Sequence, residues 1–500
     1  MHAGSRYVCH CEVPLYFAGP WQSLATVLSR VSTALKGFPV LNSSDTICAV
    51  STPLGMGGIG IVRMSGPGVV GVASKIFQPE NTIVGIGYQS HHIMYGRVVN
   101  TDSKEVVDEA LLSFMRAPKT YTREDVVEIN CHGGPAAVRK VLELCVKAGA
   151  RLAEPGEFTK RAFLNGRIDL TQAEAVMDLI AARTELSLAA AVNQLGGGLG
   201  GKVGLVREAL AELLALTELS IDFSDEDIDM VPAATLKAKG EAALADIKAL
   251  LATYDEGRVL RDGLRVAIVG RPNVGKSSLL NALARTERAI VTDIPGTTRD
   301  TVEELINLSG LPVRVIDTAG LRHSVDVVEK EGIKRSEAAL READLALVVL
   351  DGSVSLTLED TALIEKMNDT AYIPVINKSD LARATREEGL KAVFNGKEAV
   401  YISAKTGAGL DELIARIKDS ALGGGVERAP EFAINLRHKG ALERAGDALL
   451  RFDAGCDAAL SPELLALELR DALDAVGEVV GATTPEDVLD RIFRDFCIGK

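Results

Sequence analysis

One glycine-rich run has the residue types and spacing of a phosphate-binding loop. Gly270, Gly275, Lys276 and Ser277 occur in the order Gly-x-x-x-x-Gly-Lys-Ser, after a β-branched run and before a helix-like one. Glycines let backbone N–H groups wrap a β-phosphate, a lysine offsets β/γ-phosphate charge, and a serine hydroxyl ligates Mg²⁺. The run therefore predicts a nucleotide-phosphate site, with Lys276 assisting catalysis.

Three further short motifs follow in the order typical of guanine-nucleotide proteins. Asp317–Gly320 closes an apolar run, where the Asp can hold Mg²⁺ through water and the Gly N–H can contact a γ-phosphate. The Asp380 carboxylate can accept hydrogen bonds from guanine N1–H and the 2-amino group, which adenine cannot donate, and Ser403–Lys405 can contact O6. Together they predict GTP rather than ATP. The predicted GTP-binding residues are Asn273, Val274, Gly275, Lys276, Ser277, Ser278, Thr292, Asp293, Ile294, Pro295, Gly296, Thr297, Thr298, Asp317, Thr318, Ala319, Gly320, Asn377, Lys378, Asp380, Ser403, Ala404 and Lys405.

The group that orients the attacking water is open at this stage. Ras-like proteins carry a glutamine directly after the Asp317–Gly320 motif, but this chain has Leu321, which cannot orient water. A slow switch that relies on an outside activator fits these residues as well as an internal substitute does. The nearest internal candidates are Arg322, His323, Asp326 and Glu329.

A second magnesium ligand is expected between the phosphate loop and Asp317. The run Thr292–Asp300 carries hydroxyls that can complete the Mg²⁺ shell and sense the γ-phosphate, and Thr298 or Thr297 can serve. We predict Ser277 and Thr298 as the Mg²⁺ ligands.

Hydrophobic patterning predicts a multidomain α/β protein. Residues 42–163 mix short β-like runs with Gly-rich turns, as in a compact α+β domain. Residues 164–260 and 425–500 are helical and similar in composition, so we expect two parts of one helical bundle. Between them, residues 261–424 alternate strands and helices, the pattern of a Ras-like, doubly wound P-loop GTPase domain inserted into a discontinuous helical domain.

Two local expectations follow from the same patterns. The glycines of Gly196–Gly201 predict a loop between two helices. The expected strands of the inserted domain are Arg265–Val269, Val313–Ile316, Leu345–Leu350, Tyr372–Ile376 and Ala399–Ile402.

Composition excludes some classes of protein. The 500 residues, 47% hydrophobic and 25% charged, are ordinary for a globular protein of about two to four domains. No uncharged apolar run reaches the roughly 18 to 20 residues of a membrane helix, so we expect no membrane partner. A net charge of −14 argues against nucleic-acid binding by the whole surface, though not against a local basic cleft. Seven scattered cysteines suit a reducing compartment and predict a cytoplasmic protein.

The first 41 residues have no assigned role. Their few charges are mostly basic, which weakly resembles a transit peptide, but Pro14 and Pro20 interrupt any long amphipathic helix. We favour a disordered extension, or a start codon placed too far upstream. Cys9-His10-Cys11 is spaced too tightly for a usual zinc pair and has no second pair nearby.

Several runs resemble one family, the tRNA-modification GTPases called MnmE or TrmE. They are Asn273 within the phosphate loop, Gly296–Asp300, Cys497–Lys500, Thr52–Gly66 and Pro155–Asn165. The resemblance covers about residues 45 to 500 and leaves the extension outside. The terminal Cys-Ile-Gly-Lys makes the combination specific to this family.

The resemblance implies a potassium-activated GTPase whose G domains dimerise. The family's K⁺ ligands correspond to Asn273, Thr292, Ile294 and Thr297. A fixed cation beside the β–γ bridge stabilises developing charge, as an arginine finger does. The family's water-orienting glutamate falls on Glu329, which would replace the missing glutamine. Pro295 departs from the usual small residue and should stiffen this loop.

The resemblance also implies a folate site at a dimer interface. The family's N-terminal domain binds 5-formyltetrahydrofolate, or a methylene-tetrahydrofolate in the reaction, and the corresponding residues are Arg63, Glu128, Arg167 and Lys500. The carboxylate suits the pterin N–H donors and the cations suit its polar and carboxylate parts. Position 167 is more often lysine in this family. Cys497 is a candidate catalytic thiol, with a packing role as the alternative.

The resulting hypothesis is a homodimeric GTPase that acts with the flavoprotein MnmG (GidA) in a heterotetramer on tRNA. Together they would add a carboxymethylaminomethyl or aminomethyl group at carbon 5 of the wobble uridine. One rival is a ribosome-assembly GTPase, which predicts an RNA-binding appendage that the sequence does not show. Another is a folate-dependent transferase with a degenerate G domain, against which Lys276, Ser277, Asp317 and Asp380 are intact.

Overall fold

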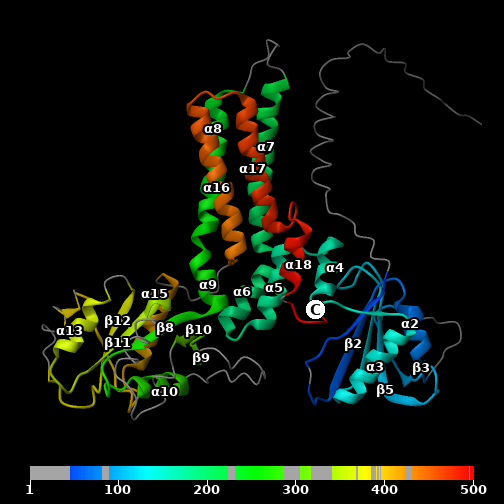
Figure 1. Ribbon diagram of the computed structural model, residues 1–500, viewed down its shortest axis with the longest axis horizontal. Coiled ribbons are helices and arrows are strands. Elements are labelled where there is room, and N and C mark those ends of the chain that lie inside the picture. The colour runs from blue at the N-terminus through cyan, green and yellow to red at the C-terminus, as the bar shows by residue number, and fades with distance from the viewer. Residues whose placement is uncertain are drawn as a thin grey trace, which may run out of the picture.

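The computed structural model describes residues 45–53, 55–80, 89–222, 231–286, 304–316, 340–367, 370–384, 390, 393–394, 396–423, 431–494 and 496–499. A helical bundle stands between two units that contain β-sheets (Figure 1). Among the described residues, no helix is both long and apolar enough to cross a membrane. The extension 1–41 lies outside the described residues.

The N-terminal unit is built on a seven-stranded sheet of order β3-β4-β5-β6-β2-β1-β7, in which only the β1–β7 pair is parallel. Side chains alternate across it, so Val62 and Met64 of β2 are buried while Arg63 lies on the opposite, open face. Helices α2 and α3 cover the buried face. The elements are β1 (Ile47–Val50), β2 (Ile59–Ser65), α2 (Val69–Ile76), β3 (Phe77–Pro79), β4 (His92–Val99), β5 (Val106–Met115), β6 (Val126–His132), α3 (Pro135–Ala148), β7 (Arg151–Leu152) and α4 (Glu157–Leu164).

The bundle is formed by helices that lie on both sides of the G domain in the sequence. One hydrophobic core joins residues of α7 and α8 to residues of α16 and α17. At Gly240 a Cβ atom would approach a Phe452 ring carbon to 2.9 Å, so the helices pack closely there. The helices of this part are α5 (Leu170–Ala181), α6 (Glu185–Leu195), α7 (Gly198–Asp222), α8 (Ala233–Ala252), α9 (Tyr254–Asp262), α16 (Leu436–Asp457), α17 (Pro462–Val480) and α18 (Glu486–Arg494).

The expected glycine loop before α7 is shorter than the sequence suggested. Only Gly196 and Gly197 separate α6 from α7, and the helix already includes Gly198, Gly200 and Gly201. At Gly200 a Cβ atom would come within 2.1 Å of the Asp169 carboxylate, which caps α5. Glycine is thus required at this helical position by close packing, which outweighs its low helix propensity.

The G domain has a six-stranded sheet of order β13-β12-β11-β8-β10-β9. All neighbours are parallel except β9, an antiparallel edge strand that the sequence patterns did not predict. Separate hydrophobic clusters cover its two faces, as in a doubly wound fold. The elements are β8 (Leu264–Val269), α10 (Lys276–Thr286), β9 (Glu304–Leu308), β10 (Leu311–Ile316), β11 (Leu345–Asp351), α13 (Leu358–Glu365), β12 (Tyr372–Asn377), β13 (Val400–Tyr401) and α15 (Leu410–Leu422).

Helices α6 and α9 join the bundle to the G domain. The Ser187 hydroxyl of α6 donates to the Leu260 carbonyl of α9 at 2.7 Å. Arg258 of α9 holds Asp344, just before β11, with both guanidinium nitrogens at 3.1 Å from the carboxylate oxygens. Gly310, in the turn between β9 and β10, packs against the side chain of Leu186. This joint therefore lies at the amino ends of the strands, whereas the phosphate loop follows the carboxyl end of β8.

The C-terminus returns to the N-terminal unit (Figure 1). Lys160 of α4 pairs with Asp490 of α18 at 2.5 Å. Phe493 packs beside Phe163, with 6.5 Å between ring centroids. Farther along, Ile498 forms an isolated antiparallel bridge with the segment before α4. The last described residues thereby reach the open face of the N-terminal sheet.

A buried polar cluster ties α5 to α16 inside the helical part. Glu174 accepts hydrogen bonds from Arg437 on both carboxylate oxygens at 2.8 Å, and His438 Nε2 lies 2.7 Å from the same carboxylate. Burial lowers the pKa of His438, although the Glu174 carboxylate opposes that shift, and His438 Nδ1 accepts the Asn435 N–H at 3.1 Å. Burial raises the pKa of Glu174, but His438 and Arg437 more than offset it and hold this pKa well below its ordinary value.

Candidate functional site

The phosphate loop has the backbone geometry that its sequence requires. Gly270 has φ +154°, and a Cβ there would come within 2.3 Å of the Val349 carbonyl oxygen. Gly275 has φ +99°, and its Cβ would come within 2.2 Å of the Asn377 amide. Lys276 begins α10, and its ammonium donates to the Gly270 and Arg271 carbonyls at 2.7 and 2.8 Å. Burial lowers the pKa of Lys276, which fits an ammonium that is directed into a loop rather than toward water.

Asn377 connects the phosphate loop to the base-binding segments. It ends β12, where only 3% of it is exposed. Its side-chain amide donates to the Val274 carbonyl at 2.9 Å, and its side-chain oxygen accepts the Ala404 N–H at 3.0 Å. One side chain thus aligns three of the predicted GTP-binding segments.

The predicted guanine contact is accessible and charged. Asp380 is exposed, and the Ser403 hydroxyl donates to its carboxylate at 2.7 Å, which lowers the pKa of Asp380. Lys378 has φ +62° and pairs with Asp351 at the end of β11 at 2.5 Å. A carboxylate that is ionised at neutral pH and faces solvent can accept the two guanine donors.

Asn273, the predicted K⁺ ligand of the phosphate loop, is exposed and has φ +64°. Ser277 and Ser278 are exposed at the start of α10, beside Lys276. Strand β10 ends at Ile316, directly before Asp317. Several predicted site residues lie outside the described residues. They are Thr292, Asp293, Ile294, Pro295, Gly296, Thr297, Thr298, Asp317, Thr318, Ala319, Gly320, Glu329 and Lys500.

Sequence reasoning missed a salt bridge that anchors the phosphate loop. Arg271 Nε donates to Asp360 Oδ1 at 2.7 Å, and the Asp360 side chain is 2% exposed. The other Asp360 oxygen accepts the N–H and hydroxyl of Thr357, both at 3.0 Å, and so caps α13. The Thr-x-x-Asp spacing was a capping-box signal that could have revealed Asp360, though not its partner.

On the N-terminal unit, two of the predicted folate-site residues meet beside the C-terminal segment. Arg63 and Glu128 face each other across β2 and β6, with the Arg63 Nε 2.8 Å from the carboxylate. Arg63 Nη1 also donates to the Gly499 carbonyl at 3.4 Å, and the Ser51 hydroxyl donates to the same carbonyl at 3.3 Å. Gly499 has φ +95°, and a Cβ there would come within 2.3 Å of Val50 O. The C-terminal segment therefore ends beside this ion pair.

Arg167 lies at the side of this cluster on an aromatic platform. Its guanidinium is 4.8 Å from the Tyr121 ring centroid, and Nη1 donates to the Tyr121 carbonyl at 3.2 Å. The Tyr121 hydroxyl hydrogen-bonds Thr159 of α4 at 2.9 Å. Burial raises the pKa of Tyr121, while the nearby charges of Arg167 and Arg63 oppose that shift. Tyr121 therefore carries Arg167 on its ring and joins it to α4, a role that the sequence did not reveal.

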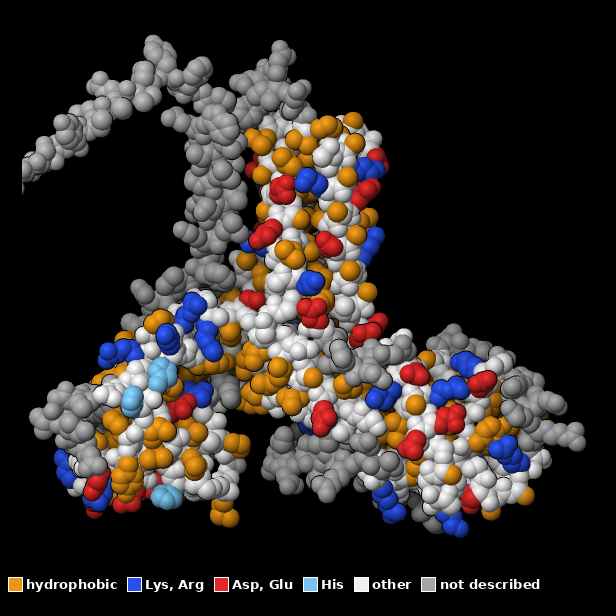
Figure 2. All heavy atoms as spheres, turned by 180° about the vertical axis from the view of Figure 1, so that it is seen from behind, with side chains coloured by type: hydrophobic (Ala, Val, Ile, Leu, Met, Phe, Trp, Pro, Cys, Tyr) orange, Lys and Arg blue, Asp and Glu red, His pale blue; other side chains and the backbone are white. Residues whose placement is uncertain are grey.

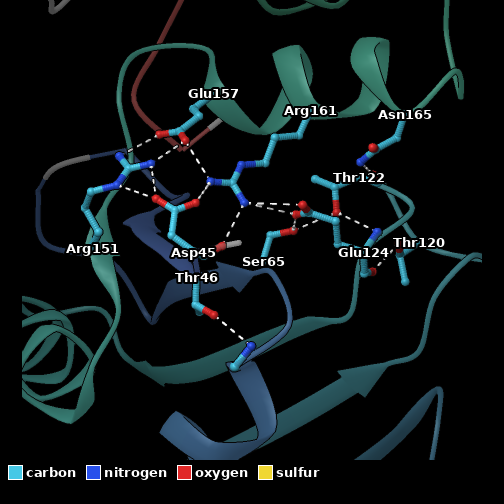
Figure 3. A network of polar contacts seen from close by, with 11 residues as sticks. Asp45, Thr46, Ser65, Thr120, Thr122, Glu124, Arg151, Glu157, Arg161 and Asn165 are labelled. Atoms are coloured by element: carbon cyan, nitrogen blue, oxygen red, sulfur yellow. Dashed lines mark hydrogen bonds and ion pairs between the residues drawn. The ribbon is translucent and has the colours of Figure 1, made fainter. Parts of the chain in front are cut away.

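A buried guanidinium supports this region from beneath (Figure 3). Arg161 is 4% exposed and reaches carboxylates of Asp45, Glu157 and Glu124 at 2.7, 2.9 and 3.3 Å. Arg151 adds bonds to the first two. Burial raises the pKa of Asp45 and of Glu157, but the hydrogen bonds from the arginines more than offset it, and both pKa values are lowered. The network joins α4 to the start of β1 and to the loop that carries Tyr121.

Cys497 is exposed, and its carbonyl accepts the Gly156 N–H at 3.4 Å. It lies two residues before Gly499, whose carbonyl accepts a hydrogen bond from Arg63. Its backbone is held, while its thiol is open to solvent.

Comparison with known proteins places the chain in a family. A family model for the MnmE helical domain matches residues 170–497, and one for the GTP-binding protein TrmE N-terminus matches residues 46–167. The tRNA modification GTPase MnmE of Geobacter sulfurreducens is 48% identical over 91% of this chain and 99% of that protein. The MnmE proteins of Alkaliphilus oremlandii and Geobacillus kaustophilus are each 46% identical with the same coverage.

The chain belongs to the MnmE family of tRNA modification GTPases. As a member of the MnmE family it is a GTPase. The family resemblance expected from the sequence is therefore confirmed.

Two solved G domains are also similar to the G domain of this MnmE-family chain. That of the T. maritima FeoB iron transporter is 30% identical, covers 32% of this chain and 98% of its own, and has a TM-score of 0.24. That of Methanococcus jannaschii FeoB is 26% identical, covers 32% and 97%, and has a TM-score of 0.24. These likenesses concern the G domain alone and carry no argument about the whole chain.

The Arg271–Asp360 pair is expected to support nucleotide affinity. Arg271→Ala would leave the buried Asp360 carboxylate without its cation and loosen the first turn of the phosphate loop, so we expect the Kd for GTP to rise about tenfold, or about 1.4 kcal/mol. Titration with a fluorescent GTP analogue measures it. Arg416→Ala removes an exposed pair with Glu398 in the same domain and is the matched control. Equal affinity of the two variants would show that the pair only stabilises the fold.

Proposed function

We propose that this GTPase uses GTP hydrolysis to drive modification of tRNA at carbon 5 of the wobble uridine. It would act with MnmG in a heterotetramer, as a homodimer, in the cytoplasm, and the product would carry a carboxymethylaminomethyl or aminomethyl group. The observation that carries the proposal is the presence, in one chain of the MnmE family, of a nucleotide site and a separate arginine–glutamate cluster beside the C-terminus.

The nucleotide site fits GTP with Mg²⁺. Lys276 would hold the β- and γ-phosphates in place of the two carbonyls that it contacts here, and Ser277 with Thr298 would hold Mg²⁺, which supplies charge neutralisation at the phosphates. The exposed Asp380 would select guanine. The glycine cradle at Gly275 leaves no space for a side chain, so backbone N–H groups can approach a phosphate there.

For hydrolysis we propose a K⁺ site at the G-domain dimer interface. Asn273 is exposed and has a left-handed backbone conformation. Thr292, Ile294 and Thr297 would complete the ligand set, and bound K⁺ would supply the positive charge of an arginine finger. Glu329 would orient the attacking water in place of the missing glutamine.

The Arg63–Glu128 cluster fits a reduced folate. The Glu128 carboxylate suits pterin N–H donors, and Arg63, Arg167 and Lys500 suit its polar and carboxylate groups. The folate would supply the one-carbon unit. Tyr121 positions the Arg167 guanidinium over its ring. The exposed thiol of Cys497 remains a candidate for proton or covalent chemistry.

The proposed tRNA reaction is tested in cells that lack the protein. Mass spectrometry of their tRNA should show wobble uridines without the carbon-5 substituent. The wild-type gene should restore it, whereas Lys276→Ala, which removes the phosphate cation, should not. Lys239→Ala, at an exposed bundle pair with Glu212, is the matched control and should restore it. Normal wobble uridines in the deletion strain would overturn the proposal.

The K⁺ site is tested by exchanging salts. Replacing NaCl with KCl should raise the GTPase rate at least about tenfold, because fixed charge at the β–γ bridge stabilises the transition state. Asn273→Gly should abolish the difference, since glycine tolerates φ +64° but lacks the amide ligand. Glu329→Gln should lose hydrolysis in both salts and still bind GTP. Equal wild-type rates in the two salts would contradict the K⁺ assignment.

The folate site is tested by calorimetry with 5-formyltetrahydrofolate. Deleting Gly499 and Lys500 should raise the Kd at least about tenfold, because the deletion removes one cation and the carbonyl that orients Arg63. Asp490→Asn breaks the Lys160 pair and loosens the same C-terminal segment without touching the cluster. This control should stay within about twofold of the wild type. Unchanged affinity after the deletion would exclude the C-terminus from the folate site.

A further inference from the structure

A short basic segment lies at the rim of the Arg63–Glu128 cluster, and its cations have no part in the proposed chemistry. Residues 116–123 connect β5 to β6 and carry Arg116, Lys119 and Arg123, all three exposed. Among the described residues, none of the three forms an ion pair with an acid. Lys147 on α3 of the same unit is, by contrast, paired with Asp102. We refer to residues 116–123 as the basic loop.

The three cations are positioned by contacts that leave their charge uncompensated. Arg116 lies over the Phe114 ring, 5.7 Å from its centroid. Arg123 donates to the Asn165 carbonyl at 2.9 Å. The Lys119 carbonyl lies 3.2 Å from the exposed His91 ring, so the loop is joined to the start of β4 while the Lys119 side chain is free to reach solvent.

The acids that follow in the sequence are occupied by other partners. Glu124 is held by Arg161 and accepts the Ser65 hydroxyl at 2.6 Å. The Asp125 carboxylate accepts the Ala117 N–H at 2.8 Å. Figure 2 shows Lys and Arg side chains gathered on the N-terminal unit above exposed histidines. This concentration of cations is notable on a chain with a net charge of −14.

The basic loop is continuous with the proposed folate site. Tyr121, in the middle of the loop, lies under Arg167 and is bonded to α4 through Thr159. Arg123 and Arg167 lie on either side of the Asn165–Gly166 turn. A polyanion that contacts the loop would therefore be led toward the place where the one-carbon unit is proposed to sit.

We propose that the basic loop binds the phosphate backbone of tRNA and places the anticodon loop beside the Arg63–Glu128 cluster. Unpaired arginine and lysine next to an aromatic ring suit single-stranded RNA, whose phosphates take the cations and whose bases stack. The interaction rests on the proposed function, because it assigns a surface for the substrate of that reaction.

Fluorescence anisotropy with an unmodified tRNA transcript tests the basic loop on the full chain. The triple variant Arg116→Ala/Lys119→Ala/Arg123→Ala, called the loop triple, should weaken tRNA binding at least about tenfold. The slope of log K against log [KCl] should become shallower by about 2, since each lost single-strand phosphate contact removes about 0.7 from it. GTPase rate should equal that of the wild type. The charge-preserving Arg116→Lys/Arg123→Lys protein should bind within about threefold of wild type.

The matched control lies on the opposite face of the same sheet. Arg139→Ala/Lys140→Ala/Lys147→Ala on α3 removes the same charge and should bind tRNA within about twofold of the wild type. Equal binding by the loop triple and the α3 triple would overturn the inference. The inference would also be overturned if the loop triple bound tRNA normally but, unlike the wild type and the α3 triple, no longer bound anionic phospholipid vesicles.

The experiment separates this inference from the proposed function. Normal wobble uridines in the deletion strain would overturn the tRNA reaction even if the loop bound RNA. Restored modification by the loop triple, together with unweakened tRNA binding, would overturn only the role of the basic loop.

Discussion

The shared core of the helical bundle is the constraint on which the rest of the structure depends. Neither the α7–α8 pair nor the α16–α17 pair can bury its apolar side alone, so the two must meet although the G domain separates them in the sequence. The buried bond between Glu174 and Arg437 then joins α5 to the same assembly. Closing the bundle sends the chain end back to the N-terminal unit, where Gly499 meets Arg63.

The phosphate loop and the Arg63–Glu128 cluster lie in different units of the chain, and a short path of packed elements connects them. The hairpin of α5 and α6 begins three residues beyond Arg167, and Leu186, in the first turn of α6, packs against Gly310 in the β9–β10 turn. Strand β10 ends directly before Asp317, which is predicted to hold Mg²⁺ through water. A change in the G domain thus has a physical route to the Arg63–Glu128 cluster, provided that this joint has two arrangements.

Sequence patterns predicted the parts of the fold in which local chemistry decides the outcome. The phosphate loop and the buried parallel strands were found because glycine spacing and continuous apolar runs are local signals. Edge strand β9 was missed because it pairs on one side only and lacks such a run. The predicted glycine loop before α7 was too long, because close packing of Gly200 against Asp169 outweighs the low helix propensity of glycine. Arg271 gave no signal, since its partner Asp360 is distant in sequence.

By itself the sequence determined the nucleotide, the family and the candidate residues, because each depends on short motifs whose chemistry is carried by neighbouring residues. Only the tertiary structure decided which distant groups meet: Arg63 with Glu128 and Gly499, and Arg161 with three carboxylates. It also showed that the cations of the basic loop are unpaired among the described residues. Whether a charge is neutralised depends on its neighbours in space, and burial and long-range pairing arise only when the chain has folded.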